Sequence, residues 1–195
     1  TKEELKMLIT THQAIKDFIG SKESKDDALL ANLATAVSQM FEKEMRRKIE
    51  TKGRVQFFDV EEGQKIFRLD AYPVTWCSVY NSESREFDEE IPRKSYTYLG
   101  RLGELVIDKY SLVPGEKVLK VEYLGGMAAD TAEFKERYPD IEMAARTQAA
   151  FWYEKRSRLG IASESVAQST THFLKLELMP IVKQVLQPYA RKCYV

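Results

Sequence analysis

Histidine and cysteine are scarce in this chain of 195 residues, which has only two of each. None of the four lies in the spacing of a zinc site such as HExxH or of a CxxC redox pair. The sequence also lacks a P-loop, a GxGxxG dinucleotide loop and the GxSxG turn of serine hydrolases. Two distant cysteines are typical of reduced thiols inside a cell. We therefore expect no enzymatic activity, no metal site and no bound cofactor.

The chain also has no excess of charge of either sign and no long apolar run. Thirty basic residues balance thirty acidic ones, so the formal net charge is zero. A balanced chain lacks the overall basic surface typical of proteins that bind nucleic acid or anionic membranes. No apolar run is long enough to span a membrane, and the first residues have no signal-peptide pattern, which predicts a soluble intracellular protein. The length fits one domain, or one domain with a substantial insert.

The first fifty residues carry a helical pattern. Thr1 and Glu4 have the spacing of a capping box, which predicts a first helix. Asp26 and Asp27 stand at the start of a long second helix that runs to about Glu50. Carboxylates at a helix start accept hydrogen bonds from its free backbone amides, so we interpret this pair as a cap and not as catalytic residues. The apolar residues of this second helix recur every three or four positions, at Leu30, Leu33, Val37, Phe41, Met45 and Ile49.

From Gly53 onward the pattern changes to that of short strands. Six segments are rich in Val, Ile, Phe, Tyr and Thr, and turn residues separate them: 54–60, 65–69, 75–80, 96–99, 104–107 and 118–123. This spacing predicts an antiparallel sheet or a small barrel-like insert, in which the polar stretch from Asn81 to Lys94 forms a long hairpin tip. The aromatic residues here have no basic groove beside them, which favours core packing and subunit contacts over base stacking.

Helices return after Gly126. We expect one over residues 130–138 and a longer one over 140–159, whose alanine-rich inner face allows close packing of a neighbouring helix. Residues 161–171 are rich in serine and unpatterned, which predicts a mobile loop. A short helix then begins near Pro180, because proline is favoured in a first turn, and ends at Pro188. Residues 189–195 are expected to be extended.

These patterns together predict an α+β protein, mainly an α-helical bundle with an antiparallel β insert in the middle of the chain. We expect N-terminal helices of the helical body in residues 1–52 and the β insert in 53–124. C-terminal helices of the body, with the mobile loop, take 125–172. A short helix and an extended docking tail take 173–195.

Several short strings occur in the order found in a known family. The chain contains "DDALLANLATAV", "LDAYPVTWCSVYN", "VLKVEYLGGM", "AAFWYEKR" and "LMPIVKQVLQPYARK". In this order they resemble the head–tail connector, or adaptor, proteins of tailed bacteriophages. The matching residues are Asp26, Asp27, Leu29, Tyr72, Pro73, Val74, Val79, Tyr123, Gly126, Pro180, Val182, Leu186, Pro188, Tyr189 and Arg191. The resemblance spans most of the chain, and it departs from the family in a larger β insert and in the last four residues.

The resemblance implies a structural virion protein of the neck, assembled in the host cytoplasm. It implies a homo-oligomeric ring, dodecameric like the portal, that extends the DNA channel and offers a platform for a tail or stopper protein. Genomic DNA would pass through without specific binding, and no membrane is involved. Two other classes stay open: an intracellular scaffold outside phages, and an enzyme of unfamiliar type.

The C-terminal segment is the candidate site for portal docking. Aromatic residues and arginine are the side chains that most often anchor protein interfaces. The short helix is expected to pack on the ring body while the peptide beyond it reaches into the portal. The residues assigned to this role are Val182, Leu186, Pro188, Tyr189, Arg191 and Tyr194. The alternative is that this segment only folds back onto its own domain.

Overall fold

A computed structural model describes residues 7–156, 163–166, 169–172 and 177–191. The chain divides into two compact units. The first is helical and takes the residues up to Met45 and from Thr131 onward. The second takes Arg46–Asp130 and is built from strands.

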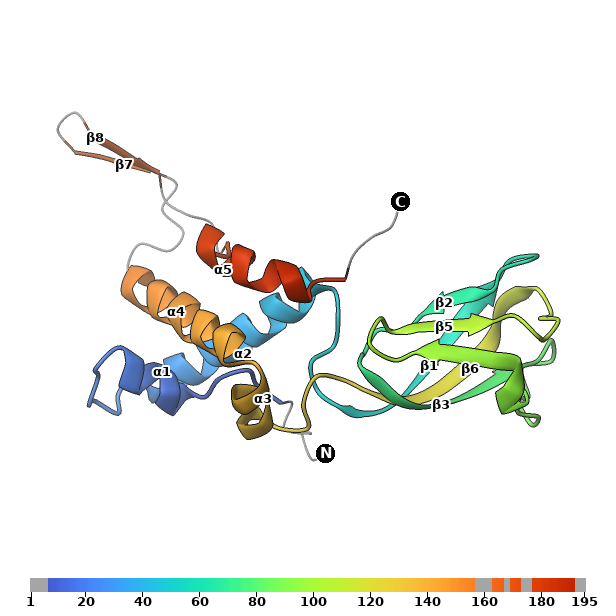
Figure 1. Ribbon diagram of the computed structural model, residues 1–195. Helices are drawn as coiled ribbons and strands as arrows, with labels where there is room; N and C mark the ends of the chain where they lie inside the picture. The colour runs from blue at the N-terminus through green and yellow to red at the C-terminus, as the bar shows by residue number, and fades with distance from the viewer. Residues whose placement is uncertain (1–6, 157–162, 167–168, 173–176, 192–195) are drawn as a thin grey trace. The chain divides into compact units, whose positions relative to one another are not determined.

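The helical unit contains five α-helices in its described residues (Figure 1). They are α1 (His12–Phe18), α2 (Asp27–Met45), α3 (Thr131–Arg137), α4 (Pro139–Lys155) and α5 (Pro180–Leu186). Helix α2 packs against α1 and α4, and α4 also contacts α3 and α5. Thr11 caps α1 through its hydroxyl, which accepts a hydrogen bond from the N–H of Ala14 at 3.1 Å.

The apolar stripe of α2 forms the core of this unit largely as its spacing predicts. Four of the six predicted residues are buried within the helix, at Leu30, Val37, Phe41 and Met45. Leu33 is only half-buried, and Ala34 takes the buried position beside it. The expectation that α2 continues to Glu50 is wrong. The helix ends at Met45 because Arg46 takes a left-handed conformation with φ of 54°, which stops the helical hydrogen-bond pattern. Ile49 is therefore buried in the other unit.

Two predicted helix caps lie in the N-terminal part of the chain. The capping pair Thr1 and Glu4 lies outside the described residues. Asp26 and Asp27 do stand at the start of α2, and their side chains also link it to its neighbours. Asp26 accepts a hydrogen bond from the Tyr153 hydroxyl of α4, and Asp27 forms an ion pair with Lys16 of α1 at 2.7 Å.

The second unit consists of two antiparallel sheets of three strands each. One has the order β1-β6-β3, from β1 (Lys52–Val60), β6 (Gly115–Gly125) and β3 (Val74–Asn81). The other has the order β2-β5-β4, from β2 (Ile66–Arg68), β5 (Glu104–Ile107) and β4 (Tyr96–Leu99), which follows a 3-10 turn at Arg93–Ser95. All six predicted strands are present, and β4 and β5 have the predicted ends.

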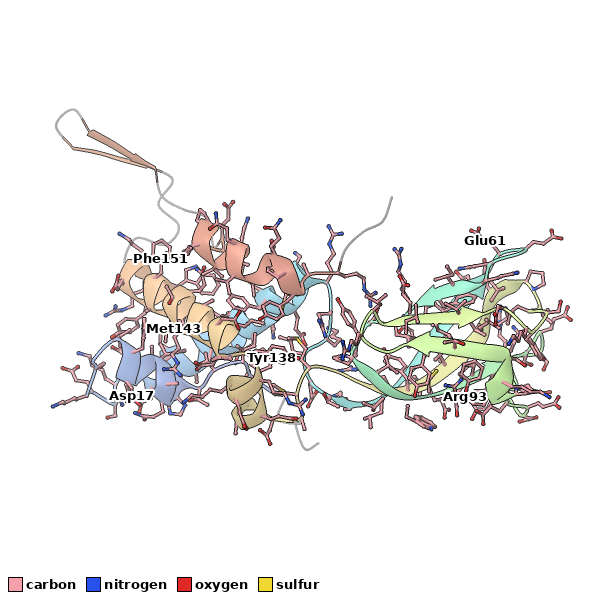
Figure 2. All side chains as sticks on the ribbon, in the orientation of Figure 1. Asp17, Glu61, Arg93, Tyr138, Met143 and Phe151 are labelled. Carbon is pink, nitrogen blue, oxygen red and sulfur yellow. The ribbon has the colours of Figure 1, made fainter. Side chains whose placement is uncertain are left out.

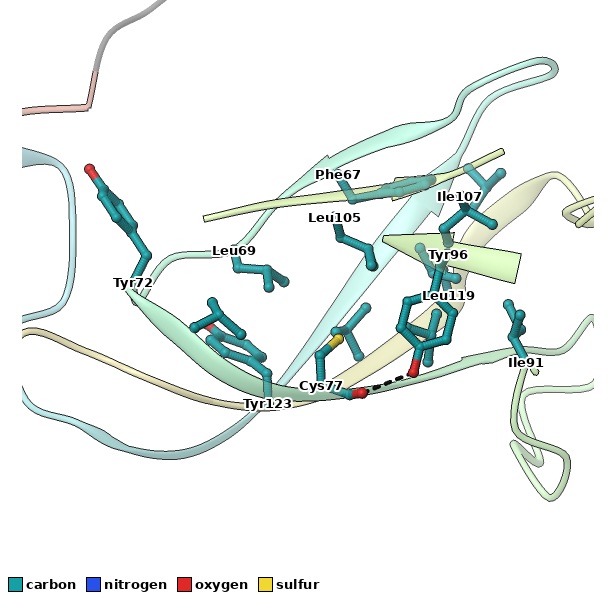
Figure 3. Close-up of a cluster of buried hydrophobic side chains, with 14 of the residues drawn as sticks. Phe67, Leu69, Tyr72, Cys77, Ile91, Tyr96, Leu105, Ile107, Leu119 and Tyr123 are labelled. Carbon is teal, nitrogen blue, oxygen red and sulfur yellow. Dashed lines mark hydrogen bonds between the residues drawn. The ribbon is translucent and has the colours of Figure 1, made fainter. Parts of the chain in front are cut away.

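The core of this unit lies between the two sheets (Figure 3). Phe67, Leu105 and Tyr96 come from one sheet, and Cys77 and Tyr123 come from the other. The Tyr96 hydroxyl donates a hydrogen bond across the core to the carbonyl oxygen of Cys77 at 2.9 Å. The strands therefore enclose an apolar core of their own.

The expectation of a mainly helical bundle that carries a β insert is wrong. The described residues have an α+β fold, with five α-helices and two three-stranded antiparallel sheets. The physical reason is that each sheet has an apolar inner face. Because the two faces cover each other, the strands need no helix to complete their core. They form a compact unit of their own, not a minor addition to a bundle.

The end of β6 passes very close to other backbone segments. Gly126 has φ of +149°, and a Cβ atom there would lie 2.4 Å from the backbone nitrogen of Thr51. A Cβ atom on Gly125 would lie 2.5 Å from the carbonyl oxygen of Ala71. Both distances are too short for a side chain, so only glycine fits at these positions.

Two further strands lie in the stretch that was expected to be an unpatterned loop. β7 (Ser163–Val166) and β8 (Ser169–His172) pair with each other as an antiparallel two-stranded sheet. The serine-rich sequence gave no period-two signal, because most of its positions are small or polar. Among the described residues, none of the helices is both long and apolar enough to cross a membrane.

Candidate interaction site at the C-terminus

The start of the C-terminal segment lies against α4, where one buried polar side chain of that helix holds it. Gln148 is fully buried on the alanine-rich face of α4. Its side-chain oxygen accepts a hydrogen bond from the N–H of Met179 at 2.7 Å, and its amide donates to the carbonyl of Glu177 at 3.4 Å. A buried amide is stable only when its polar atoms find partners, and these two bonds supply them. Gln148 therefore fixes the residues just before α5.

Helix α5 packs on α4 and α2 through one apolar face. Leu178, Val182 and Leu186 are buried there, whereas Ile181 on the other side is 55% exposed. Pro180 occupies the first turn, as the sequence predicts. Two of the predicted docking residues, Val182 and Leu186, thus contribute their side chains to the core of their own unit.

Tyr189 connects the end of this segment to the junction of α3 and α4. It lies in a 3-10 turn (Gln187–Tyr189) that continues from α5, together with the exposed Pro188. The Tyr189 hydroxyl donates a hydrogen bond to Oδ2 of Asp140 at 2.9 Å. Its ring meets the ring of Tyr138 edge to face, with centroids 5.7 Å apart. Figure 2 shows Tyr138 at this junction.

The electrostatic surroundings of Tyr189 favour its neutral form. Partial burial raises the pKa of Tyr189, and the hydrogen bond to the Asp140 carboxylate raises it further. The phenol therefore stays protonated and keeps donating to Asp140 at neutral pH. This contact ties the end of the C-terminal segment to the start of α4.

Arg191 is the last described residue, and it lies at the C-terminal end of α2. Its backbone N–H donates to the carbonyl oxygen of Met45 at 3.0 Å. The last carbonyls of a helix lack partners within the helix, so this bond satisfies one of them. The structure thus brings Val182, Leu186, Tyr189 and Arg191 together on the helical unit. The remaining predicted docking residue, Tyr194, lies outside the described residues.

Sequence patterns did not identify the partners that hold this segment. A glutamine among the alanines of α4, as at Gln148, is a signal for a buried hydrogen bond. Asp140 was expected only to begin a helix. The pairing of either residue with the C-terminus depends on how α5 folds back, which no local pattern encodes.

The described residues contain no cluster of side chains suited to metal binding. No group of three or more His, Cys, Asp or Glu side chains lies close enough to hold a metal ion in this part of the chain. Cys77 is buried in the β core, and burial raises the pKa of its thiol to about 12. The buried Glu142 accepts hydrogen bonds from Arg146 at 2.6 Å and Thr10 at 3.0 Å, which ties α4 to the N-terminal segment.

Comparison with solved structures finds the same fold in a phage-like particle. One match is in the virion of a native gene transfer agent particle, with a TM-score of 0.63 and 14% identity over 94% of this chain and 90% of that chain. A second is in the neck of the native particle, computed with C12 symmetry, with a TM-score of 0.62 and 14% identity over 94% and 89%. A third is in the neck of the empty particle, computed with C6 symmetry, with a TM-score of 0.63 and 13% identity over 94% and 90%.

Comparison by sequence gives a family. A search of curated proteins found no match. A family model described as head completion protein, however, matches residues 8–192. This range includes most of both compact units and every described residue of the candidate interaction site, so it covers far more than half of the chain. The chain therefore belongs to the head completion protein family.

Proposed function

We propose that this protein is a structural component of the neck that joins the head to the tail of a phage or phage-like particle. The match of the head completion family over residues 8–192 carries this proposal. The fold shared with proteins of gene transfer agent necks supports it. A joining role needs surfaces rather than reactive groups, so the protein acts without catalysis or a cofactor.

We further propose that copies of the chain form a dodecameric ring under the portal. The C12 and C6 symmetries belong to the neck structures that share this fold, and they support a cyclic arrangement here. The ring extends the DNA channel, and genomic DNA passes through it without specific binding. The zero net charge suits this role, because each basic contact to a phosphate adds affinity and would hold the DNA.

The C-terminal segment is the part that we assign to portal docking. Val182 and Leu186 pack α5 on the helical unit, and Tyr189 and Arg191 fix the point from which the tail departs. The last four residues, which include Tyr194, then reach into the portal. An extended peptide gains affinity by adding backbone hydrogen bonds to a partner. Pro188 is exposed at the turn and limits how the chain bends there.

The other side of the ring is a platform for a tail or stopper protein. The place of action is the neck of the virion, and assembly takes place in the host cytoplasm. No membrane takes part.

A truncation after Arg191 tests the docking role. This variant keeps the Tyr189–Asp140 bond and the Arg191–Met45 bond, so the helical unit should fold as before. We expect it to lose binding to portal rings from the same phage, and filled heads should then fail to accept tails. Ile181→Ala, an exposed change on α5, is the matched control and should bind normally. Unchanged affinity of the truncated chain would mean that the helical body is the anchor.

Electron microscopy of the full chain mixed with its portal tests the ring itself. We expect a closed ring on the lower face of the portal with the portal's symmetry. Isolated copies bound to the portal, with no contact between them, would contradict the ring. The chain alone is expected to be monomeric or weakly associated, with ring formation completed on the portal.

A further inference from the structure

The outer face of the β1-β6-β3 sheet carries large apolar side chains that the unit itself leaves exposed. Val55 and Phe57 project from β1, Trp76 from β3 and Leu124 from β6. Trp76 is 51% exposed and Phe57 is 49% exposed. The strand register places Trp76 directly opposite Leu124, so the four side chains lie on one side of the sheet. We call these four residues the Trp76 face.

The charged residues within this face neutralise each other. Lys120 and Glu122 project from β6 between the apolar side chains and form an ion pair at 2.6 Å. Phe87, from the segment between β3 and β4, packs against Phe57 with ring centroids 5.7 Å apart. One end of the face is thus covered by the protein's own chain, whereas the Trp76 end is open. An open aromatic surface whose two charges form an ion pair suits a protein partner.

The other sheet of the same unit has a second apolar outer surface. Ile66 on β2 is 54% exposed, and Leu102, in the turn between β4 and β5, is 55% exposed. Leu99, at the end of β4, is also exposed. An ion pair lies on this sheet as well, because the Arg68 Nε atom is 3.8 Å from a carboxylate oxygen of Glu104. We call Ile66, Leu99 and Leu102 the Leu102 face.

The two faces differ in composition and belong to different sheets, with the apolar core between them. A closed ring uses one head-to-tail contact repeated around its axis, so each copy must offer two different surfaces. We propose that the Trp76 face of one copy packs against the Leu102 face of the next copy. This inference rests on the ring of the proposed function and assigns the surfaces that join its subunits.

A second copy fits these faces better than a charged partner does. Neither face offers the basic surplus that nucleic acid would require, because the ion pairs lie within each face. The half-exposed aromatic and aliphatic side chains of the Trp76 face leave on the order of 300 Å² of apolar surface. A standard interface buries about 800 Å² on each partner. This contact alone is therefore weak between free copies and becomes stable when a ring closes or a template holds the copies together.

Two face variants and their mixture test the proposal. The first carries Phe57→Glu with Trp76→Glu, and the second carries Ile66→Glu with Leu102→Glu. Tyr110→Glu, at an exposed tyrosine between β5 and β6, is the matched control. Each protein is treated with an amine-reactive crosslinker at high concentration, once alone and once together with portal rings. The sizes of the products are then measured, and thermal unfolding checks that every variant folds.

We expect the unmodified chain and the Tyr110 control to give a ladder of crosslinked species. Each face variant alone should remain monomeric, and the mixture of the two should give dimers that grow no further. The reason is that the intact Leu102 face of the first variant still meets the intact Trp76 face of the second.

Three results would overturn the inference in distinguishable ways. If both folded face variants keep the full ladder, the subunits join elsewhere and the ring itself stands. If the second variant alone forms dimers, the Trp76 face pairs with itself. If the unmodified chain gives no ladder even on the portal, the ring of the proposed function fails together with the inference.

Discussion

The side-chain oxygen of Gln148 accepts a hydrogen bond from the backbone N–H of Met179 at 2.7 Å, on a helix face rich in alanine. This bond joins α4 to the start of α5, 31 positions later in the chain. Alanines allow the close approach of the two segments, and the glutamine supplies the polar partner that the approaching backbone needs. The position of the whole C-terminal segment depends on this pair.

Gln148→Leu should destabilise the protein although leucine has a similar size. The substitution leaves the N–H of Met179 without its partner in a partly buried place, which costs about 1–3 kcal/mol. Chemical denaturation measures the loss in the free energy of unfolding. Gln184→Leu is the control, because Gln184 is exposed on α5 and its change should stay within about 0.5 kcal/mol. Equal effects of the two substitutions would show that the Gln148 bond does not hold α5.

Phe41→Ala should have a larger effect, because Phe41 is fully buried in the core of the helical unit. Removing a buried aromatic side chain leaves a cavity and costs roughly 3–5 kcal/mol. Met143→Ala on α4 is the matched control, since Met143 is nearly half exposed and should contribute little. A loss below about 1 kcal/mol for Phe41→Ala would mean that the apolar face of α2 is not a packed core.

Two truncations separate the stabilising part of the C-terminus from its tail. A chain that ends at Arg191 keeps every described contact of this segment and should unfold like the full chain. A chain that ends at Leu186 loses the Tyr189–Asp140 bond, the Tyr138–Tyr189 ring contact and the bond from Arg191 to Met45. We expect it to be less stable by about 1–3 kcal/mol. The two midpoints of thermal unfolding give this difference, and coinciding midpoints would rule out a structural role for Tyr189.

Cys77 should resist thiol reagents until the β unit unfolds. Burial raises the pKa of Cys77 to about 12, and the reactive form of a cysteine is the thiolate. Labelling followed by mass spectrometry measures the rate, with Cys193 replaced by serine so that one thiol remains. Fast labelling of the native protein at pH 8 would contradict the buried position.

The same pKa shift predicts a dependence of stability on alkaline pH. The folded state keeps the proton of Cys77 more tightly than the unfolded chain, in which a thiol has a pKa of ~8.5. The stabilisation is therefore complete below that pH and is lost as the pH rises from there toward 12. The difference in stability between the unmodified chain and Cys77→Ala should shift in favour of the variant between pH 8 and 11. A constant difference would show that the thiol has no such shift.

The sequence predicted the individual helices and strands better than the relative size of the helical and β parts of the fold. β4 and β5 begin and end at the expected residues because turn glycines stand beside them, at Gly100 and Gly103. The end of α2 was placed too late, since the left-handed Arg46 interrupts an apolar spacing that continues to Ile49. The independence of the β unit was missed for a related reason. Strand patterns show that each sheet has an inner face, but they do not show that two such faces cover each other.

The candidate site was predicted only in part. The apolar face of α5 follows from the spacing of Val182 and Leu186, and Pro180 and Pro188 give its limits. The contacts of Tyr189 with Asp140 and of Arg191 with Met45 join residues that are distant in sequence. Such pairings arise from tertiary folding, so a pattern of single residues does not contain them. The docking of the tail on a portal stays a prediction.

The close backbone contacts at Gly125 and Gly126 limit how this chain can diverge during evolution. Proteins with 13–14% identity to it share its fold, so most positions have accepted other residues. A Cβ atom at Gly126 would overlap the backbone of Thr51, and no neighbouring side chain can move to make room. Three positions earlier, the Tyr123 hydroxyl joins Gln56 at 3.1 Å and the backbone of Ala71 at 3.4 Å. Selection should therefore retain a tyrosine and a glycine at this spacing after most other sequence similarity has been lost.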